Sequence, residues 1–209
     1  MRLRNIKGSK EIIEQSNYVI KNPFEYIGKF NNQFRNNNPI YIEIGMGKGN
    51  FIIENARRYQ NINFIGIEKY DSVMIRALEK LNNEKLDNLK LIRIDAKDIN
   101  KIFDKEIDLI YLNFSDPWPK DRHFKRRLTS TDFLERYDKI FKEKKHIIMK
   151  TDNRKLFEFS IMSFTSNNYK INEIFLDLYK DDITDNIPTE YEIKFSNQGY
   201  PIYKIDVEK

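Results

Sequence analysis

The sequence contains no cysteine and only two histidines, His123 and His146, among its 209 residues. The absence of thiols excludes disulfide bonds and the thiolate sites that hold structural zinc. The two histidines are too few and too far apart in the sequence to form a metal-ligand cluster. We therefore expect neither a disulfide framework nor a bound metal.

Long apolar runs are also missing. No segment approaches the roughly 20 apolar residues that cross a bilayer, and the basic start with Arg2, Arg4 and Lys7 leads into no apolar stretch. We expect a cytosolic protein with no membrane contact and no obligatory protein partner, either a monomer or a homodimer. A chain of this length fits one core. Residues 1–36 are expected to form a basic N-terminal arm and helix packed on the core, and residues 37–209 a single domain.

Positive charge is in moderate excess. The net charge of +5 and the isoelectric point near 9.1 suit a polyanionic partner. However, isoleucine, lysine and asparagine are abundant throughout the chain, so the total reflects a general compositional bias. Local clusters of charge are therefore better evidence for a nucleic-acid partner than the total charge is.

The most informative stretch is Pro39–Phe51, an apolar strand pattern that ends in three alternating glycines. Ile40, Ile42 and Ile44 have the spacing of a buried strand, and the glycines allow a sharp turn and close approach of a ligand. A helix beginning at about residue 49 would direct its free N–H groups at whatever lies in the loop. This pattern predicts the nucleotide-binding corner of a doubly wound α/β sheet.

The spacing of the glycines argues against a dinucleotide. A Gly-x-Gly-x-x-Gly fingerprint that began at Gly45 would place its third glycine at position 50, which is Asn50 here. The acid before the loop, Glu43, would repel a pyrophosphate but attract an ammonium group. S-adenosylmethionine carries an ammonium group and a sulfonium group and no phosphate, so it is the favoured cofactor.

Three successive predicted strands end on carboxylates. Glu43, Glu68 and Asp95 occupy these positions, and Glu68 comes 23 residues after Gly45, close to where such sites place the acid that binds ribose hydroxyls. A single acid of this kind could merely cap the next helix. Because the carboxyl ends of parallel strands share one edge of a sheet, three of them predict a common crevice.

A rigid aromatic loop and a basic run follow the fourth predicted strand, residues 107–114. Ser115–Lys120 holds the only tryptophan, Trp118, between two prolines, which fix φ and reduce the ordering cost of binding. Asp121–Arg127 is the densest basic cluster and contains an aromatic residue. A charge run is usually a solvated face, but one beside an active-site loop is a candidate for phosphate contacts.

The remaining pattern completes an α/β fold with a doubly wound sheet. Asn22-Pro23-Phe24-Glu25 is typical of a helix start, and the helix would continue to Phe34. Residues 169–179 and 200–207 alternate like an antiparallel pair at the sheet edge, and Thr189–Glu192 falls in a polar loop between them. The other strands are expected at 63–68, 89–94 and 146–152, and the other helices at 51–59, 73–81, 131–141 and 155–164.

Together these motifs resemble the bacterial tRNA (guanine-N7)-methyltransferases over nearly the whole chain. The resemblance rests on Glu43–Gly49, Gly66–Glu68, Asp95-Ala96, the Ser115–Lys120 loop with its basic continuation, and Thr189-x-x-Glu192. The glycine loop alone would indicate only a methyltransferase, but Asp-Pro-Trp-Pro-Lys followed by His-x-Lys-Arg-Arg is a narrow signature. The resemblance implies a class I S-adenosylmethionine-dependent methyltransferase (Rossmann-like) fold, with tRNA as partner and the variable-loop guanosine at position 46 as acceptor.

The resemblance also implies roles for particular residues. It places cofactor binding on Glu43, Gly45, Gly47, Gly49, Glu68, Asp95, Ala96 and Asp116, with Asp116 also the catalytic residue. It places guanosine contacts on Lys120, Asp152, Thr189, Glu190, Tyr191 and Glu192, and RNA contacts on Arg122, His123, Phe124, Lys125, Arg126 and Arg127.

The chemistry of guanine N7 agrees with the residues present. N7 exposes a lone pair and carries no proton, so methylation needs in-line placement and negative charge near the ring rather than a general base. Asp116 could supply that charge. A carboxylate from Asp152 or Glu192 could accept the N1–H and N2–H₂ groups of guanine, and the sequence leaves open which of them does so.

Three alternatives stay open on the sequence alone. The same fold could methylate another RNA base or a protein side chain, and the Asp-Pro-Trp-Pro loop with its basic continuation disfavours this. A catalytically silent RNA-binding protein is disfavoured by the intact strand-end acids. A dehydrogenase is the least favoured alternative, because Asn50 stands where a dinucleotide-binding loop would have its third glycine.

Overall fold

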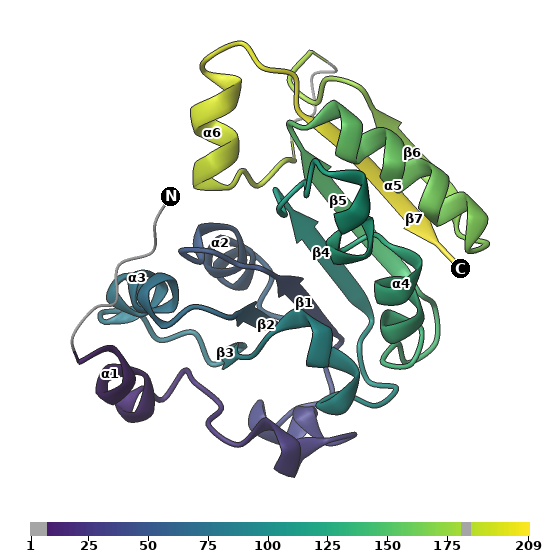
Figure 1. Ribbon diagram of the computed structural model, residues 1–209. Helices are drawn as coiled ribbons and strands as arrows, with labels where there is room; N and C mark the ends of the chain where they lie inside the picture. Colours follow the sequence, from purple (N-terminus) through teal and green to yellow (C-terminus); the bar gives the residue numbers. More distant parts are fainter. Residues whose placement is uncertain (1–7, 181–184) are drawn as a thin grey trace.

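The structure, a computed structural model, describes residues 8–180 and 185–209 and is built on one seven-stranded sheet (Figure 1). The strands are β1 (Ile40–Ile44), β2 (Asn63–Glu68), β3 (Leu89–Arg93), β4 (Leu109–Asn113), β5 (His146–Thr151), β6 (Lys170–Phe175) and β7 (Tyr203–Glu208). Their order in the sheet is β3-β2-β1-β4-β5-β7-β6. The predicted strands are all present.

The first five strands of the chain run parallel, and the last two do not. β1 pairs in parallel with both β2 and β4, whereas β7 is antiparallel to β5 and to the edge strand β6. The predicted antiparallel edge pair is therefore confirmed. Strand order reverses at β1, and in open α/β sheets ligands bind outside the carboxyl ends of the strands at such a point.

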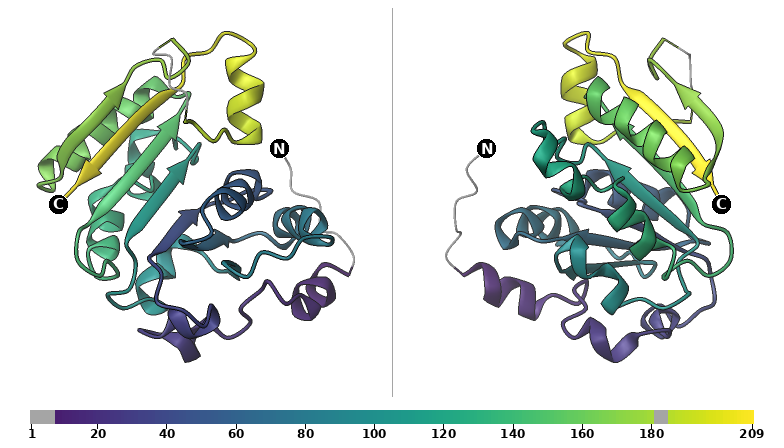
Figure 2. Two further views of the ribbon diagram at one scale, coloured as in Figure 1. Left: turned by 180° about the vertical axis from the view of Figure 1, so that it is seen from behind. Right: turned by 45° about the vertical axis from the view of Figure 1, so that its right-hand side comes forward.

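Helices cover the sheet on both faces (Figures 1 and 2). On one face of the sheet, over β1–β3, lie α1 (Ser9–Gln15), α2 (Asn50–Arg58) and α3 (Asp71–Leu81). On the other face lie α4 (Thr131–Tyr137) and α5 (Arg154–Ser166). The last helix, α6 (Glu190–Ser196), stands beyond the carboxyl edge of the strands, close to the start of α2. No helix in the described ranges is both long and apolar enough to cross a bilayer.

Successive side chains of a strand point to opposite faces of the sheet and so pack against different helix layers. Ile40, Ile42 and Ile44 are 0–1% exposed and pack with α4 and α5, as their spacing predicts, while Tyr41 turns to the layer of α2 and α3. Each fully buried Ile side chain contributes about 1.5–3 kcal/mol. Burial on both faces explains why the central strands read as nearly continuous apolar runs.

The N-terminal segment packs on the edge strand β3. α1 contacts α3, and the backbone of residues 18–20 hydrogen-bonds to Leu91, with Ile20 N–H donating to Leu91 O over 2.9 Å. This segment therefore covers the open edge of the sheet. The basic residues Arg2, Arg4 and Lys7 lie outside the described residues.

Two local predictions were wrong. The helix expected from Pro23 to Phe34 is replaced by two 3₁₀ turns, Pro23–Tyr26 and Phe30–Gln33, because Gly28 between them adopts φ +70° and its N–H donates to Glu106. The polar loop expected at Thr189–Glu192 is instead the cap and first turn of α6. The apolar face, with Phe30 and Phe34 buried, forms nevertheless.

The close packing of the glycine loop on α3 gives a stability prediction. Gly49 has φ +78°, and a Cβ there would lie 2.8 Å from Ala77 Cβ. Gly199 has nearly the same φ, +79°, with open space around its Cβ position. We expect Gly199→Ala to lower the free energy of unfolding by about 1–2 kcal/mol through the left-handed backbone alone. Gly49→Ala should cost about 1–3 kcal/mol more, because it also overpacks the contact with α3.

Chemical denaturation of the two variants and the wild type measures this difference. Equal losses in the two variants would show that the contact between Gly49 and Ala77 is not tight.

Candidate active site

Two buried hydrogen-bond acceptors without partners lie at the carboxyl ends of β1 and β4. Asn113 Nδ2 donates to Glu43 Oε1 over 2.9 Å, and the two residues are 6% and 2% exposed. Glu43 Oε2 and Asn113 Oδ1 have no hydrogen-bond partner of good geometry among the described residues, although the backbone N–H of Ile52 faces the Glu43 carboxylate closely enough to help lower its pKa. A buried acceptor without a donor costs about 1–3 kcal/mol, so this pair is arranged for a donor that comes from outside the chain.

The electrostatics of Glu43 fit a cationic donor. Burial raises the pKa of Glu43 to about 7, although the hydrogen bond from Asn113 and the positive charge of Lys150 lower it. Near neutral pH the carboxyl is therefore poised between its two protonation states. An ammonium group placed here would favour the ionised state and satisfy both free acceptors, so the site fits the amino-acid end of S-adenosylmethionine.

The glycine loop forms an open surface beside these acceptors. Gly45 is exposed, Gly47 is half-buried with φ +58°, and a Cβ at either position would meet nothing within 4 Å. Gly49 differs, because it is buried against α3 and precedes the first residue of α2. Gly45 and Gly47 are thus free to face a ligand, while Gly49 serves the packing of the loop.

Glu68, at the end of β2, closes the other side of the loop. Its Oε2 accepts a hydrogen bond from Gly47 N over 3.1 Å, and its Oε1 accepts from Lys69 N and Tyr70 N. Burial raises the pKa of Glu68, these backbone donors oppose the increase, and the negative charge of Asp116 adds to it. Glu68 and Asp116, which are 48 residues apart, therefore face one crevice, as the strand ends predict.

Asp95 completes the row of acids after β3. It caps the 3₁₀ helix Ala96–Lys101 by accepting from Lys97 N, and it forms an ion pair with Lys69 at 2.7 Å. Burial alone would raise the pKa of Asp95, but the Lys69 ammonium and the Lys97 N–H hold it below its usual value. Asp95 is therefore ionised in this arrangement. Ala96, which begins the 3₁₀ helix, is half-buried next to it.

The loop that carries Asp116 has an unusual backbone. Phe114 and Trp118 adopt φ +49° and +42°, which bulky residues rarely do. Phe114 N donates to Lys150 O over 2.8 Å, which fixes the start of the loop to β5. Asp116 itself is exposed, at the mouth of the crevice. Such strained loops persist only where surrounding contacts determine them, and they cluster at functional sites.

The basic run forms a 3₁₀ helix, Asp121–Arg126, that packs beside this loop. Arg122, Lys125 and Phe124 are exposed, as is Lys120 before them. The Arg126 guanidinium lies 4.9 Å from the Trp118 ring centroid, and the His123 ring lies 5.8 Å from it.

Arg127 faces inward instead. Its Nε and Nη2 donate to the carbonyl oxygens of Pro117 and Trp118, each over 3.1 Å. The run therefore divides into side chains open to solvent and side chains engaged with the loop.

A buried ion pair connects α6 to the sheet. Lys150 Nζ lies 2.6 Å from Glu192 Oε2, and their side chains are 3% and 0% exposed. Burial lowers the pKa of Lys150, and the Glu192 carboxylate opposes this effect. Glu192 Oε1 accepts from Asn186 and Tyr179, and its Oε2 also accepts from Thr189 N in a capping box. All of the acceptor capacity of Glu192 is directed into the protein.

Glu190 is engaged at the other end of the first turn of α6. Its carboxylate pairs with Lys48 of the glycine loop at 3.2 Å and with Lys80 of α3 at 2.7 Å. Lys80 Nζ also donates to Lys48 O and to Asn50 Oδ1. Of the four residues Thr189–Glu192, only Tyr191 is exposed, at 45%.

Asp152 follows β5 and lies next to Tyr191. It is half-buried, burial raises its pKa, and its negative charge contributes to the raised pKa of Tyr191. The Tyr191 ring lies 5.2 Å from Phe114, at the start of the Asp116 loop. The structure therefore brings Asp152, Tyr191 and the Asp116 loop together. Thr189, Glu190 and Glu192 are engaged in a capping box and in ion pairs, and the expectation that they contact guanosine stays a prediction.

Several residues of the site were missed from sequence. Asn113 ends a strand in the same way as Glu43 does, so the strand-end pattern could have identified it. Lys150 and Lys80 gave no local signal, because their partners Glu192 and Glu190 lie 42 and 110 residues further along the chain.

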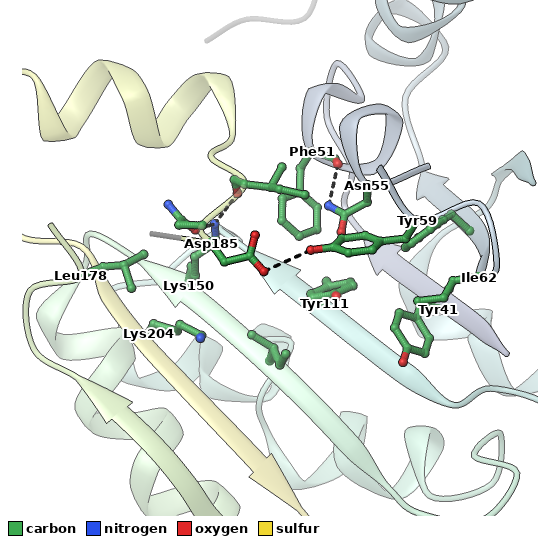
Figure 3. Close-up of a pocket in the computed structure, with 14 residues that line it drawn as sticks. Tyr41, Phe51, Asn55, Tyr59, Ile62, Tyr111, Lys150, Leu178, Asp185 and Lys204 are labelled. Atoms are coloured by element: carbon green, nitrogen blue, oxygen red, sulfur yellow. Dashed lines mark hydrogen bonds between the residues drawn. The ribbon is translucent and has the colours of Figure 1, made fainter. Parts of the chain in front are cut away.

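A cavity of about 220 Å³ opens on the α2 face of the sheet (Figure 3). Phe51, Tyr59 and Tyr111 form aromatic walls, and Tyr59 Oη donates to Asp185 across it over 3.3 Å. None of the residues predicted for the cofactor or for guanosine lines this cavity. Lys150, which pairs with Glu192 at the strand ends, does line the cavity and so connects it with the strand ends.

Comparison with known proteins gives consistent results. A family model described as "Putative methyltransferase" matches residues 37–205. A tRNA (guanine-N(7)-)-methyltransferase of Lachnoclostridium phytofermentans is 52% identical over 98% of this chain and 97% of its own length. Enzymes of the same name from Geobacillus and Streptococcus pneumoniae are 50% and 47% identical, each over 100% of this chain and over 96% and 100% of their own.

Solved structures are similar in fold at low sequence identity. A chain described as an antibiotic-related methyltransferase has a TM-score of 0.65 at 16% identity, over 87% of this chain and 92% of that one. An S-adenosylmethionine-dependent methyltransferase from Aquifex aeolicus has a TM-score of 0.55 at 13% identity, over 96% and 97%. These likenesses support the class I methyltransferase sheet.

The raised pKa of Glu43 predicts that cofactor affinity depends on pH. With a pKa of about 7, the carboxyl must lose a proton before it can accept hydrogen bonds from an ammonium group. Affinity for S-adenosylhomocysteine should therefore rise between pH 5.5 and 7, by up to about tenfold per unit, because the α-amino group of this free amino acid stays protonated throughout that range. Calorimetry in buffers of different ionisation enthalpy measures both the affinity and the released proton.

Glu43→Gln is the matched control, because it keeps the shape and removes the titration. The affinity of this variant for S-adenosylhomocysteine should be lower than that of the wild type and should not change with pH. A wild-type affinity that does not change over this range would show that Glu43 does not bind the ammonium group.

Proposed function

The chain belongs to the family of tRNA (guanine-N(7)-)-methyltransferases, and from that membership we propose that it methylates N7 of the variable-loop guanosine at position 46 of tRNA. The observation that carries the proposal is the pair of buried acceptors, Glu43 Oε2 and Asn113 Oδ1, beside an open glycine loop whose neighbour Glu68 lies within reach of the charge of Asp116. Such a crevice accepts a cationic amino-acid group and holds a carboxylate next to the reacting centre.

The residues at the strand ends hold the cofactor in this proposal. Glu43 and Asn113 accept hydrogen bonds from its ammonium group, and Gly45 and Gly47 let its chain approach the backbone. Glu68 accepts from the ribose hydroxyls, and the Asp95-Ala96 segment contacts the base. When bound, S-adenosylmethionine supplies an electrophilic methyl group on its sulfonium.

Asp116 acts by charge rather than by taking a proton. N7 has no proton to lose, and the purine ring becomes cationic as the new bond forms. A fixed carboxylate next to the ring stabilises that charge, and the strained loop holds it there before the reaction starts.

Asp152 is the better candidate to read the guanine edge. Glu192 is fully buried and each of its oxygens accepts hydrogen bonds from protein groups, whereas Asp152 is half-buried beside the exposed ring of Tyr191. A carboxylate can accept both N1–H and N2–H₂ of guanine, and adenine presents no such pair of donors. Tyr191 offers an aromatic surface to the base, and Lys120 a positive charge.

The exposed cations of the basic run serve the RNA backbone. Arg122 and Lys125 are exposed next to the Asp116 loop, with the exposed Phe124 between them in the sequence, and Lys125 Nζ lies 4.0 Å from Asp132 Oδ2. Cations in such a position release counterions when they contact phosphates, which favours binding of a polyanion.

Nucleoside analysis tests the proposal directly. Unmodified tRNA is incubated with the protein and S-adenosylmethionine, digested and analysed by mass spectrometry, and N7-methylguanosine is the expected product. Another methylated nucleoside would support the alternative of a different RNA base, and no product at all would favour a silent RNA-binding protein. A transcript that carries adenosine at position 46 tests the site of methylation, and it should yield no N7-methylguanosine.

Replacing Asp116 separates charge stabilisation from proton removal. We expect Asp116→Asn to lower the single-turnover rate on the order of 10²–10³-fold, because it keeps the shape and loses the charge. Binding of tRNA should change little. With saturating cofactor, the wild-type rate should stay flat from pH 6 to 8. A rate that rises tenfold per pH unit there, and no longer does so in Asp116→Asn, would identify Asp116 as a base.

Replacing Asp152 tests guanine recognition. We expect Asp152→Asn to lower kcat/KM roughly 10- to 100-fold, the range for lost charged hydrogen bonds, without changing cofactor affinity. A transcript with inosine at the target position lacks the N2 amino group, so the wild type should prefer guanosine and the variant should discriminate less.

Glu158→Gln, an exposed change on α5, is the control, because Glu158 bonds only to the exposed Arg154 among the described contacts. The same preference for guanosine over inosine in Asp152→Asn and the wild type would remove Asp152 from this role.

Some expectations from the sequence remain predictions. These are the cytosolic location, the absence of an obligatory partner, the choice between monomer and homodimer, and the division of the chain at residue 37. Light scattering of the purified protein with and without tRNA measures the oligomeric state.

A further inference from the structure

The last arginine of the basic run has a different environment from the others. Arg127 is half-buried, whereas Arg122, Lys125 and Arg126 are exposed. Its Nε and Nη2 donate to two consecutive carbonyl oxygens, of Pro117 and Trp118, each over 3.1 Å. Its guanidinium also lies 4.4 Å from the ring centroid of Phe159 on α5. The side chain therefore bridges the core helix α5 and the loop that carries Asp116.

The loop needs such a contact. Trp118 has φ +42°, a conformation that bulky side chains rarely adopt, and Phe114 at the start of the loop has φ +49°. Pro117 and Pro119 have no N–H, so the loop has few backbone donors with which to hold itself. The carbonyl oxygens that Arg127 binds belong to the two residues after Asp116. Fixing them fixes the direction of the Asp116 carboxylate.

The donor geometry also makes arginine specifically suitable. A guanidinium presents parallel N–H groups in a rigid plane, so it can bind two adjacent oxygens while its face packs on an aromatic ring. A lysine ammonium keeps the charge but cannot reproduce this planar fork. A phosphate contact would tolerate lysine, because it depends mainly on charge.

We propose that Arg127 is a positioning residue that holds the Asp116 loop in its active conformation, and that it does not contact tRNA phosphates. The proposal rests on the proposed methyl transfer, in which Asp116 lies beside the target base. It divides the basic run into two parts. Arg127 orders the loop from inside, and Arg122 and Lys125 form the surface for RNA.

Two substitutions at one position distinguish positioning from phosphate binding. Arg127→Lys keeps the charge and removes the fork, so the single-turnover rate with saturating tRNA and cofactor should fall on the order of 10²-fold, as expected for a misplaced catalytic group. Arg127→Gln removes the charge, and the slope of log Kd for tRNA against log salt should stay at the wild-type value. Arg122→Gln is the matched control and should reduce that slope by about one.

Trp118 provides a readout that does not require catalysis. It is the only tryptophan of the chain, so fluorescence excited at the long-wavelength edge of its absorption, where tyrosines do not absorb, reports on this loop alone. Both Arg127 variants should increase the quenching of Trp118 by acrylamide, and Arg122→Gln should leave it unchanged. Phe159→Leu, which removes the ring under the guanidinium, should change rate and quenching in the same direction by a smaller factor, and it tests the proposal if an Arg127 variant does not fold.

The outcomes separate cleanly. A lower salt slope in Arg127→Gln, or a wild-type rate in Arg127→Lys, overturns the proposal and returns Arg127 to the RNA surface. Unchanged Trp118 quenching in both variants also overturns it. If the wild type does not methylate tRNA, the proposed function fails, while the fluorescence still decides whether Arg127 holds the loop.

Discussion

The buried ion pair between Lys150 and Glu192 is the contact on which the rest of the active site depends. The side chain of Lys150 holds α6 through Glu192, and its backbone carbonyl accepts a hydrogen bond from Phe114, where the Asp116 loop begins. Asp152 follows directly after the end of the same strand. Removing either partner would leave a buried charge without compensation, which costs about 3–5 kcal/mol. Lys150 of β5 thus connects α6 and the start of the Asp116 loop to one strand, which ends directly before Asp152.

The carboxylates of the crevice are held in two different ways. Glu68 and Asp95 receive hydrogen bonds from backbone N–H groups of their own surroundings, so their positions are fixed before any ligand arrives. Glu43 and Asn113 instead keep one acceptor each without a partner in a buried position. That arrangement weakens the protein when it is empty and strengthens the binding of a cation. In the proposed function, the ammonium group of the cofactor removes the free-energy cost of these unpaired acceptors when it binds, and this favours its binding.

Sequence patterns predicted the site best where the relevant signal was local. The position of an acid at the end of an apolar run correctly placed Glu43 and Glu68, because strand ends of a parallel sheet meet at one edge. Partners far apart in the chain gave no such signal. The sequence treats Glu192 as a candidate to accept from guanine, and its buried ion pair with Lys150, 42 residues earlier, is visible only in the structure. Local propensity also failed where a single tertiary contact intervened, as at Gly28, whose N–H donates to Glu106 and divides an expected helix.

Net charge overestimates the number of cations that are free to bind RNA, because several of them are paired within the protein. Lys48, Lys80 and Lys150 are paired with the acids of α6, and Arg127 is bound to backbone carbonyls. These cations raise the isoelectric point but are already occupied within the protein. The sequence does not distinguish an arginine that donates to two backbone carbonyl oxygens from an arginine that is free to bind a phosphate. In the proposed function the charge that faces RNA is therefore smaller and more localised than the basic run indicates, because it is assigned to Arg122 and Lys125, and Lys125 Nζ also lies 4.0 Å from Asp132 Oδ2.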